Sequence, residues 1–386
     1  MRFQNYVTRT VKLSLFLLTV MVSCLVLQHY FLRNVDHNSL RIEGFYQEDH
    51  DSLDVVLIGA SDIYTSFMPG RTYEQHGFTS YLLASESITS EGIITAVKEV
   101  VRTQHPNLIV IEANAFLYSN SNNETNEGHI HKFFDNLPLS VNKIDYIQKY
   151  VPFDQKAEYY FPLIKYHSLW SELPTRINMM ASNLSLDLRG YNLLKGFRTT
   201  ANIMKTDKKC LNQQLLTETG TLELDPTLES QLMDLLSYCT KNNLNVLFVR
   251  APHYVTSETY DRVKRSNQMA SIVKEHGFSY YSIENIAAQI GIDEKRDFYN
   301  EDHMNIYGAL KFTDYLAEKL VSQEKLKTDP LSNYLKDQWE DVVASTNQLY
   351  RYCDNIMTSG NSRGAQEDVI TLTELENYSD AHIDKP

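Results

Sequence analysis

The sequence has few cysteines, and none of them is spaced for a metal. Cys24, Cys210, Cys239 and Cys353 lie far apart in a chain of 386 residues, whereas zinc sites built on cysteine use closely spaced pairs. We interpret these residues as isolated small hydrophobic side chains, with Cys24 inside a membrane segment. A disulfide between Cys210 and Cys239 would be allowed outside the cytoplasm, but the sequence does not require one.

The sequence also lacks the glycine-rich motifs of nucleotide-binding proteins and an excess of positive charge. It contains neither a Gly-x-Gly-x-x-Gly motif nor a Walker sequence. Its 36 Lys and Arg residues against 49 Asp and Glu give a formal net charge of −13 at pH 7. Such a chain lacks the basic face that nucleic acid needs, and it does not bind anionic head groups strongly. We therefore expect no nucleic-acid partner, and we also expect no cofactor and no metal.

Near its start the chain has one long apolar run, at residues 13–32. About 20 such residues are enough to cross a bilayer. Arg2, Arg9 and Lys12 precede the run, so residues 1–12 should stay in the cytoplasm. A cleaved signal peptide is the rival interpretation, but no small-x-small cleavage site follows Leu27. We predict a single-pass anchor in the cell membrane, with the main domain outside the cytoplasm.

Strand and helix patterns alternate along residues 51–325, after a short polar stalk predicted for residues 33–50. Short β-branched and aliphatic runs predict strands at residues 54–59, 78–84, 107–114, 245–252 and 278–282. Helical spacing of apolar residues predicts helices at residues 91–103, 228–241, 257–276 and 306–320. This alternation is typical of an α/β domain with a mainly parallel sheet.

The alternation breaks between about residues 115 and 215. This stretch is rich in tyrosine and includes a predicted helix at residues 141–150. We interpret it as a helical insertion beside the sheet, acting as a lid or a substrate platform. Residues 326–386 are predicted to hold one more helix, at residues 335–357, followed by a disordered acidic tail.

Two stretches far apart in the sequence carry candidate catalytic residues. The first predicted strand ends in Gly59, Ala60 and Ser61, and ligands of open α/β sheets bind at the carboxyl edge. A serine there can act as a nucleophile, although capping the next helix is the alternative. His303, just before the last predicted helix, can supply the base that a serine needs. A surface or capping histidine is the alternative for His303.

These stretches resemble the SGNH (GDSL-like) hydrolase family. The resemblance rests on residues 58–61 (Ile-Gly-Ala-Ser) and 302–309 (Asp-His-Met-Asn-Ile-Tyr-Gly-Ala), and it extends over roughly residues 50–325. It is closest to the membrane-anchored branch with the D-alanyl-lipoteichoic-acid biosynthesis esterase and the alginate O-acetyltransferases. The resemblance implies a three-layer α/β sandwich with Ser61 as nucleophile and His303 as base.

The chain departs from this family at the third catalytic position. The Asp-x-x-His spacing of the family would place an acid at position 300, where this chain has Asn300. An amide oxygen can orient an imidazole, but it lacks the full negative charge of a carboxylate. Asp302, adjacent to His303, and Asp297 are the alternatives for this role.

The oxyanion donors implied by the resemblance are only partly present. They would be the backbone N–H of Ser61, a glycine N–H after the second strand and an asparagine side chain after the third. The second position has Ser85 in place of glycine, so only its backbone N–H is available there. The third is filled by Asn114, for which a simple turn residue is an equal alternative.

Within the insertion, His167 and Tyr191 are candidates for a groove that binds a glycan or an acyl acceptor. We predict an extracytoplasmic serine esterase or O-acyltransferase that acts on esters of cell-envelope polysaccharide or uses their acyl donor. The resemblance implies a membrane-bound O-acyltransferase as a partner. The alternative hypothesis is a weakly active or inactive glycan-binding or assembly module with the same fold, because of Asn300 and the missing glycine.

Overall fold

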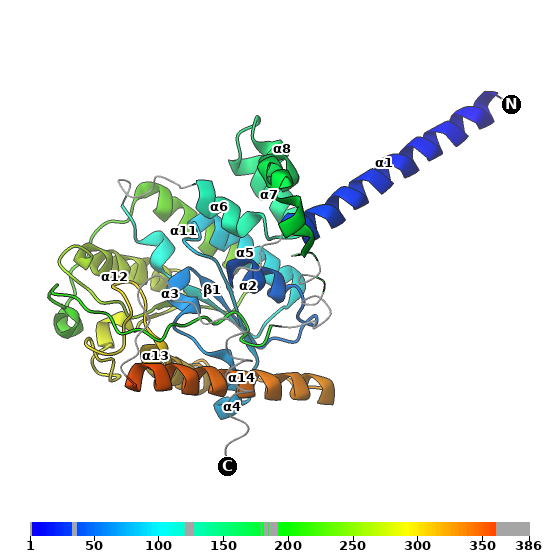
Figure 1. Cartoon of the computed structure of the whole chain (residues 1–386). Helices are drawn as coiled ribbons and strands as arrows, with labels where there is room; N and C mark the ends of the chain where they lie inside the picture. Colours follow the sequence, from blue (N-terminus) through cyan, green and yellow to red (C-terminus); the bar gives the residue numbers. More distant parts are fainter. Residues whose placement is uncertain are drawn as a thin grey trace, which may run out of the picture.

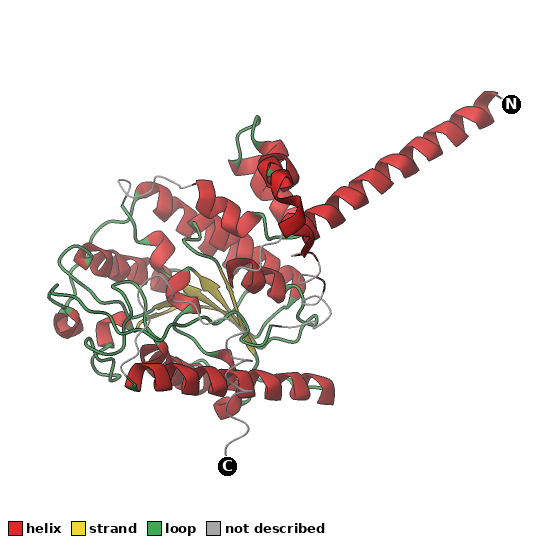
Figure 2. Ribbon diagram, in the orientation of Figure 1, coloured by secondary structure: helices red, strands yellow, loops and turns green. Residues whose placement is uncertain are grey.

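The centre of the structure is a five-stranded parallel sheet with the strand order β2-β1-β3-β4-β5 (Figure 1; Figure 2). This computed structural model describes residues 2–32, 37–119, 127–178, 180, 184 and 192–359. The strands are β1 (Val55–Gly59), β2 (Ser80–Ala84), β3 (Leu108–Glu112), β4 (Val246–Arg250) and β5 (Ser279–Ser282). All residues of β1 to β4 are buried. The predicted α/β class with a parallel sheet is therefore confirmed.

Helices surround this sheet and supply most of the remaining regular structure. The principal α-helices are α1 (Arg2–Leu32), α2 (His37–Phe45), α3 (Ser61–Tyr64), α4 (Pro69–His76), α5 (Ser90–Thr103), α6 (Glu127–Phe134), α7 (Val141–Tyr150), α8 (Lys156–Tyr160), α9 (Pro162–Lys165), α11 (Pro226–Lys241), α12 (Tyr260–Glu275), α13 (Ile306–Ser322) and α14 (Asn333–Thr358). Short 3-10 helices are η1 (Asn114–Phe116), η3 (His167–Glu172), η4 (Asn212–Thr217) and η5 (Glu284–Ile286). The helices predicted from apolar spacing agree with α5, α7, α11, α12, α13 and α14 to within a few residues at each end.

Alternate side chains of the strands enter two hydrophobic clusters, because successive residues of a strand point to opposite faces. Val56 and Ile58 of β1 belong to the cluster that includes residues of α5 and α11. Val55 and Leu57 belong to the cluster that includes residues of α3 and α13. Helices therefore cover both faces of the sheet, with α13 and α14 on the side opposite α5 and α11 (Figure 1).

The strand order places the reversal in the direction of strand addition at the carboxyl end of β1. From β1 the chain continues to β2 on one side, and then crosses to β3 on the other side. Ligands of open parallel sheets bind where the direction of strand addition reverses. Gly59 at the end of β1 pairs with Ala84 of β2, so the two strands end level. The residues that follow β1, β2 and β3 therefore meet at one edge.

Part of the segment expected to be a polar stalk is instead a buried helix. Residues 37–45 form α2, which contacts β2 and α6. The Arg41 side chain is buried, with its Nε donating to the Gly196 carbonyl oxygen at 2.7 Å. Asn38 donates to the Lys132 carbonyl oxygen at 2.8 Å. These polar residues suggested a stalk because their hydrogen-bond partners lie far away in the sequence.

The N-terminal helix α1 is a candidate membrane span. Its residues Tyr6–Leu27 have a mean hydropathy of 2.2 and are not buried against the rest of the described chain. The helix projects away from the domain, and α7 and α8 of the insertion lie near its domain end (Figure 1). Helix α9 contacts α1 directly. The predicted N-terminal apolar helix is therefore present.

The remaining expectations concern the cysteines and the C-terminal tail. Cys210 and Cys239 are not joined in a disulfide. Cys239 and Cys353 are buried in the hydrophobic clusters. The tail predicted to be disordered lies, from residue 360 onward, outside the described residues.

Candidate active site

Ser61 is the first residue of α3, directly beyond the carboxyl end of β1. The N-cap of α3 is Ala60, so the Ser61 hydroxyl does not cap this helix. Its Oγ lies 2.6 Å from Nε2 of His303. A Cβ at Gly59 would lie only 2.8 Å from Cβ of Glu112, so glycine is needed where β1 meets β3. The sequence around Ser61 therefore presents its hydroxyl to a histidine rather than to the backbone.

His303 is held by a short loop ahead of α13. Phe298 and Met304 form an isolated antiparallel bridge, and the Tyr299 N–H donates to the His303 carbonyl oxygen at 3.1 Å. The Tyr299 and His303 rings stack with their centroids 5.3 Å apart. A Cβ at Gly308 would lie 2.4 Å from the Asp297 carbonyl oxygen, so glycine lets the loop pack on α13. This packing fixes the imidazole relative to Ser61.

Asn300 occupies the orienting position behind His303. Its Oδ1 lies 2.9 Å from Nδ1 of His303 and accepts from the backbone N–H of Asp302 at 3.0 Å. Because that N–H can only donate, the atom of Asn300 between the two groups is the oxygen. Nδ1 of His303 must then carry the proton, which leaves Nε2 as the acceptor for the Ser61 hydroxyl. The arrangement is a Ser-His-Asn chain with the base in the correct tautomer.

The carboxylates of Asp302 and Asp297, the two alternative acids, bind other partners than His303. The Asp302 carboxylate is half exposed and pairs with Nη1 of Arg262 at 3.2 Å. Asp297 is buried and accepts from the Lys311 ammonium at 2.6 Å and the Asp293 N–H at 2.7 Å. Neither carboxylate is within hydrogen-bond reach of the imidazole, so the orienting contact belongs to Asn300.

Burial sets the protonation state of His303. It lowers the pKa of His303 below its ordinary value, and it outweighs the negative charges of Asp62 and Asp302, which act in the opposite direction. The imidazole is therefore neutral near pH 7. A neutral imidazole is the form that can accept the proton of the serine.

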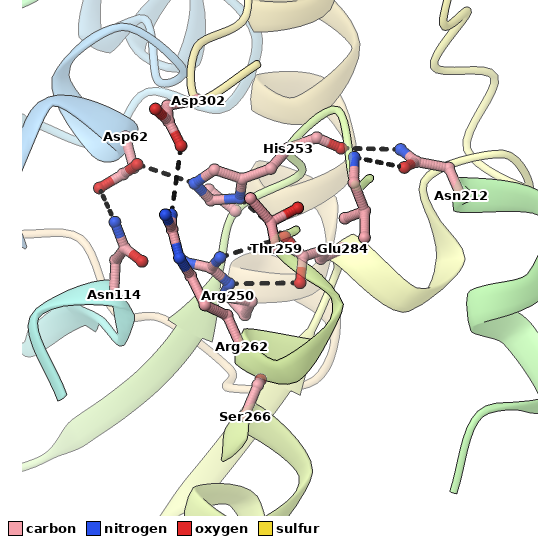
Figure 3. Close-up of polar contacts among 12 residues, drawn as sticks. Asp62, Asn114, Asn212, Arg250, His253, Thr259, Arg262, Ser266, Glu284 and Asp302 are labelled. Atoms are coloured by element: carbon pink, nitrogen blue, oxygen red, sulfur yellow. Dashed lines mark hydrogen bonds and ion pairs between the residues drawn. The ribbon is translucent and has the colours of Figure 1, made fainter. Parts of the chain in front are cut away.

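Five ionisable side chains form a buried chain of contacts that starts at Asp62, the residue after Ser61. Figure 3 labels four of them, Asp62, His253, Arg250 and Glu284. Oδ1 of Asp62 lies 2.8 Å from Nε2 of His253, and Nδ1 of His253 lies 2.8 Å from Oε1 of Glu284. Nη2 of Arg250 lies 3.3 Å from Glu284, and its Nη1 lies 3.4 Å from Glu112. Glu112 and Arg250 are the last residues of β3 and β4. Asp62 and His253 follow β1 and β4, and Glu284 lies in η5, after β5. The carboxyl edge of the sheet therefore carries a continuous charged layer beside the serine.

The charges of this layer nearly balance. Burial and the charge of Arg250 oppose protonation of His253, but its hydrogen bonds to Asp62 and Glu284 prevail and raise its pKa to about 9. Burial, assisted by the charge of Asp62, raises the pKa of Glu112 to about 7. Burial also opposes ionisation of Asp62, but the hydrogen bond from His253 prevails and lowers its pKa. Near neutral pH two cations thus face two full anions and a carboxyl group near its midpoint.

The groups expected to stabilise an oxyanion are largely occupied. The Ser85 N–H donates to the Gly59 carbonyl oxygen at 3.2 Å and continues the sheet. Nδ2 of Asn114 donates to Oδ2 of Asp62 at 3.0 Å and to the Tyr118 hydroxyl at 3.1 Å, so both amide hydrogens are used. The backbone N–H of Ser61 has no acceptor within the helix that it begins. The buried Ser85 hydroxyl has no hydrogen-bond partner among the described residues.

Of the two predicted groove residues, only His167 lies within the described part of the chain. His167 lies in η3 of the insertion, where its Nδ1 contacts the Ile164 carbonyl oxygen at 3.0 Å. Tyr191 lies outside the described residues.

Among the described residues no group of three or more His, Cys, Asp and Glu side chains is placed to hold a metal. Comparison of the chain with family models, curated proteins and solved structures gave no match.

His253 is one of the residues of the charged layer, with Arg250 and Glu284, that the sequence analysis did not identify. It follows β4 by three residues, at the same edge of the sheet as Ser61. Because ligands of open parallel sheets bind at the carboxyl edge, residues just after β4 are candidates for the site on the same grounds as residues just after β1. Its partner Asp62 was also visible as the residue after Ser61, but the contact between them spans 191 positions.

Proposed function

We propose that this protein is an extracytoplasmic serine esterase or O-acyltransferase of the SGNH class, acting on esters of cell-envelope polysaccharide. The observation that carries the proposal is the hydrogen-bonded chain from Ser61 through His303 to Asn300, with 2.6 and 2.9 Å between its members. A nucleophile within reach of a base, with that base oriented by a third group, is the arrangement of covalent acyl transfer.

The proposed reaction passes through an acyl-enzyme. Ser61 Oγ attacks the acyl carbonyl carbon while Nε2 of His303 accepts the hydroxyl proton. The tetrahedral intermediate collapses, and His303 returns the proton to the oxygen of the leaving alcohol. Water or a polysaccharide hydroxyl then attacks the acyl-enzyme, with His303 again as base, and Ser61 is released. Water as acceptor gives an esterase, and a sugar hydroxyl gives an O-acyltransferase.

The backbone N–H of Ser61 and the Ser85 hydroxyl are our candidates for stabilising the negative oxygen. Both belong to residues that follow neighbouring strand ends of the sheet. Donors aimed at the developing charge are usually the largest single contribution to this kind of catalysis. Asn114 would join them only after giving up its contact with Asp62 or Tyr118.

The proposed location rests on the N-terminal segment, and the proposed fold class rests on the helices around the sheet. Arg2, Arg9 and Lys12 precede the apolar run, which supports an N-terminus in the cytoplasm and a domain outside it. The helices on both faces of the parallel sheet support a three-layer SGNH-like arrangement. A membrane-bound O-acyltransferase as a partner remains part of this proposal through the resemblance alone.

A second candidate function is a glycan-binding or assembly module with little activity. It is favoured by Asn114, whose amide hydrogens are both engaged, and by Ser85, whose N–H belongs to the sheet. A fluorophosphonate probe on the full-length protein in detergent separates the two functions. We expect labelling of the wild type and of Ser322→Ala, a control on the exposed part of α13, and none of Ser61→Ala. A wild type that stays unlabelled would favour the module.

A further inference from the structure

Exposed hydrophobic side chains are concentrated in the insertion. Outside α1, the described residues include fourteen large hydrophobic side chains that are exposed, and ten of them lie between residues 139 and 184. Phe153, 90% exposed, and Val141, 72% exposed, are the most exposed of the fourteen. Scattered single residues of this kind are normal on a protein surface, but a concentration marks an interaction site.

These side chains belong to elements that contact one another. Val141 and Ile144 lie on α7, Phe153 lies between α7 and α8, and Ile164 lies on α9. Helix α7 contacts α8, and α8 contacts α9. The opposite side of α7 packs inward through Tyr146 and Ile147. The insertion therefore has its own packed side and an outward side that carries the exposed apolar residues.

The insertion lies against the helix that is the candidate membrane span. Helix α9 contacts α1. Leu25 and His29 of α1 line a cavity of about 1120 Å³ together with Pro162, Tyr166 and Leu169 of the insertion. Figure 1 shows α7 and α8 beside the end of α1 that joins the domain. If α1 spans a bilayer, the insertion lies where the chain leaves it.

The charge of the insertion also differs from that of the chain. Residues 139–178 contain five Lys and Arg and four Asp and Glu, whereas the whole chain carries a net charge of −13. A near-neutral surface is not repelled by anionic head groups, while the acidic remainder of the chain is. Exposed apolar residues on such a surface are stabilised when they enter the boundary between head groups and acyl chains.

We infer that the outward side of α7, the α7–α8 connection and α9 is a membrane-contacting surface that inserts Phe153 and Val141 into the lipid interface. This inference goes beyond the proposed function and rests on the proposed anchoring by α1. The occupant is the outer leaflet around α1, because the anchor and this surface are adjacent. The contact is mainly hydrophobic, so it does not require anionic lipid.

Tryptophan quenching by brominated lipids tests the inference on the full-length protein in phospholipid vesicles. Phe153→Trp reports on the proposed surface, and Val141→Trp gives a second reporter if the first variant folds poorly. Leu18→Trp reports on the middle of α1. Tyr334→Trp is the matched control, because Tyr334 is 63% exposed on α14, on the face of the sheet away from the insertion.

We expect lipids brominated near the head group to quench the added emission of Phe153→Trp at least twofold, in 0.5 M salt as well as at low salt. Tyr334→Trp should emit equally in brominated and plain lipid. Leu18→Trp should be quenched by deeply brominated lipid. If Leu18→Trp is quenched but Phe153→Trp, like Tyr334→Trp, is not, the inferred membrane contact is wrong while the anchoring by α1 stands. An unquenched Leu18→Trp would overturn the anchoring, and the inference with it.

Discussion

Asn300 offers one oxygen to two donors, Nδ1 of His303 at 2.9 Å and the N–H of Asp302 at 3.0 Å. An aspartate at this position could accept both hydrogen bonds with the same oxygen. The difference between the two residues is therefore charge rather than shape. The imidazolium that forms when His303 accepts a proton is stabilised less by an amide than it would be by a carboxylate.

Asn300→Asp should raise kcat, and it should also raise the pKa of His303. The added negative charge favours the protonated imidazole, so the pKa of His303 should rise by about 1 unit or more. The acidic limb of the pH profile of kcat should move to higher pH by the same amount. The measurement is kcat against pH on one acetyl ester.

Asp302→Asn is the matched comparison for that measurement. Because the Asp302 carboxylate is half exposed and pairs with Arg262, its removal should shift the acidic limb down only slightly. A large loss of kcat in Asp302→Asn without any gain in Asn300→Asp would assign the orienting role to Asp302 instead.

Removing the nucleophile and removing the base should have the same effect. Ser61→Ala, His303→Ala and the double variant should each lose about 10⁴-fold or more in kcat, because a nucleophile and its base act as one unit. Steady-state hydrolysis of a small acetyl ester measures this loss. Near wild-type turnover in His303→Ala would show that another group is the base.

Ser85→Ala tests the proposed oxyanion donor. Loss of a donor that acts in the transition state should lower kcat by about 10²-fold and leave KM nearly unchanged. Ser90→Ala is a control, because the Ser90 hydroxyl is bonded to Gln231 rather than placed at the strand edge. Equal activities of Ser85→Ala and Ser90→Ala would remove the Ser85 hydroxyl from the mechanism.

The buried charged layer should make stability fall as pH rises. The folded-state pKa of His253 is about 9, above its ordinary value of 6.5, so the folded protein binds more protons than the unfolded chain between these values. The stabilisation is fully present below about pH 6.5 and is lost as pH rises through about 9, a change of roughly 3 kcal/mol. The apparent Tm of the full-length protein, measured from pH 6 to 10, should fall across this window.

His253→Gln supplies the control for that pH dependence. A glutamine does not titrate, so the fall in Tm between pH 6.5 and 9 should be much smaller in this variant, although its Tm should be lower near neutral pH. Glu112→Gln keeps His253 and should retain the fall. Equal slopes for the wild type and His253→Gln would mean that another group is responsible.

The sequence was sufficient for the parallel sheet and for the three residues that the structure brings into contact, Ser61, His303 and Asn300. Short aliphatic runs such as 108–112 predict buried strands directly, and the strand-end rule then selects Ser61. The Asp-x-x-His spacing of the family that the chain resembles points to Asn300. These inferences succeed because they depend on local patterns, or on the common edge that parallel strands share.

Other features could not be predicted because they depend on contacts between distant residues. The Asp62–His253 pair joins residues that follow β1 and β4, two strands on either side of β3, and their ends share one edge only once the sheet has formed. Arg41 and Asn38 look like stalk residues until their partners around Gly196 and Lys132 are known. Two oxyanion donors suggested by position, the backbone N–H of Ser85 and the side-chain amide of Asn114, are engaged by neighbours that a sequence does not show.

The packing of α2 on the sheet limits how far the domain can move from its anchor. Only residues 33–36 separate the end of α1 from the start of α2, and four residues extend no more than about 15 Å in any conformation. Because α2 is part of the domain, the proposed anchored enzyme would sample only a thin layer next to the bilayer. Acyl groups on the distal part of a long polymer would be out of its range, so modification would have to occur while the acceptor is still at the membrane surface.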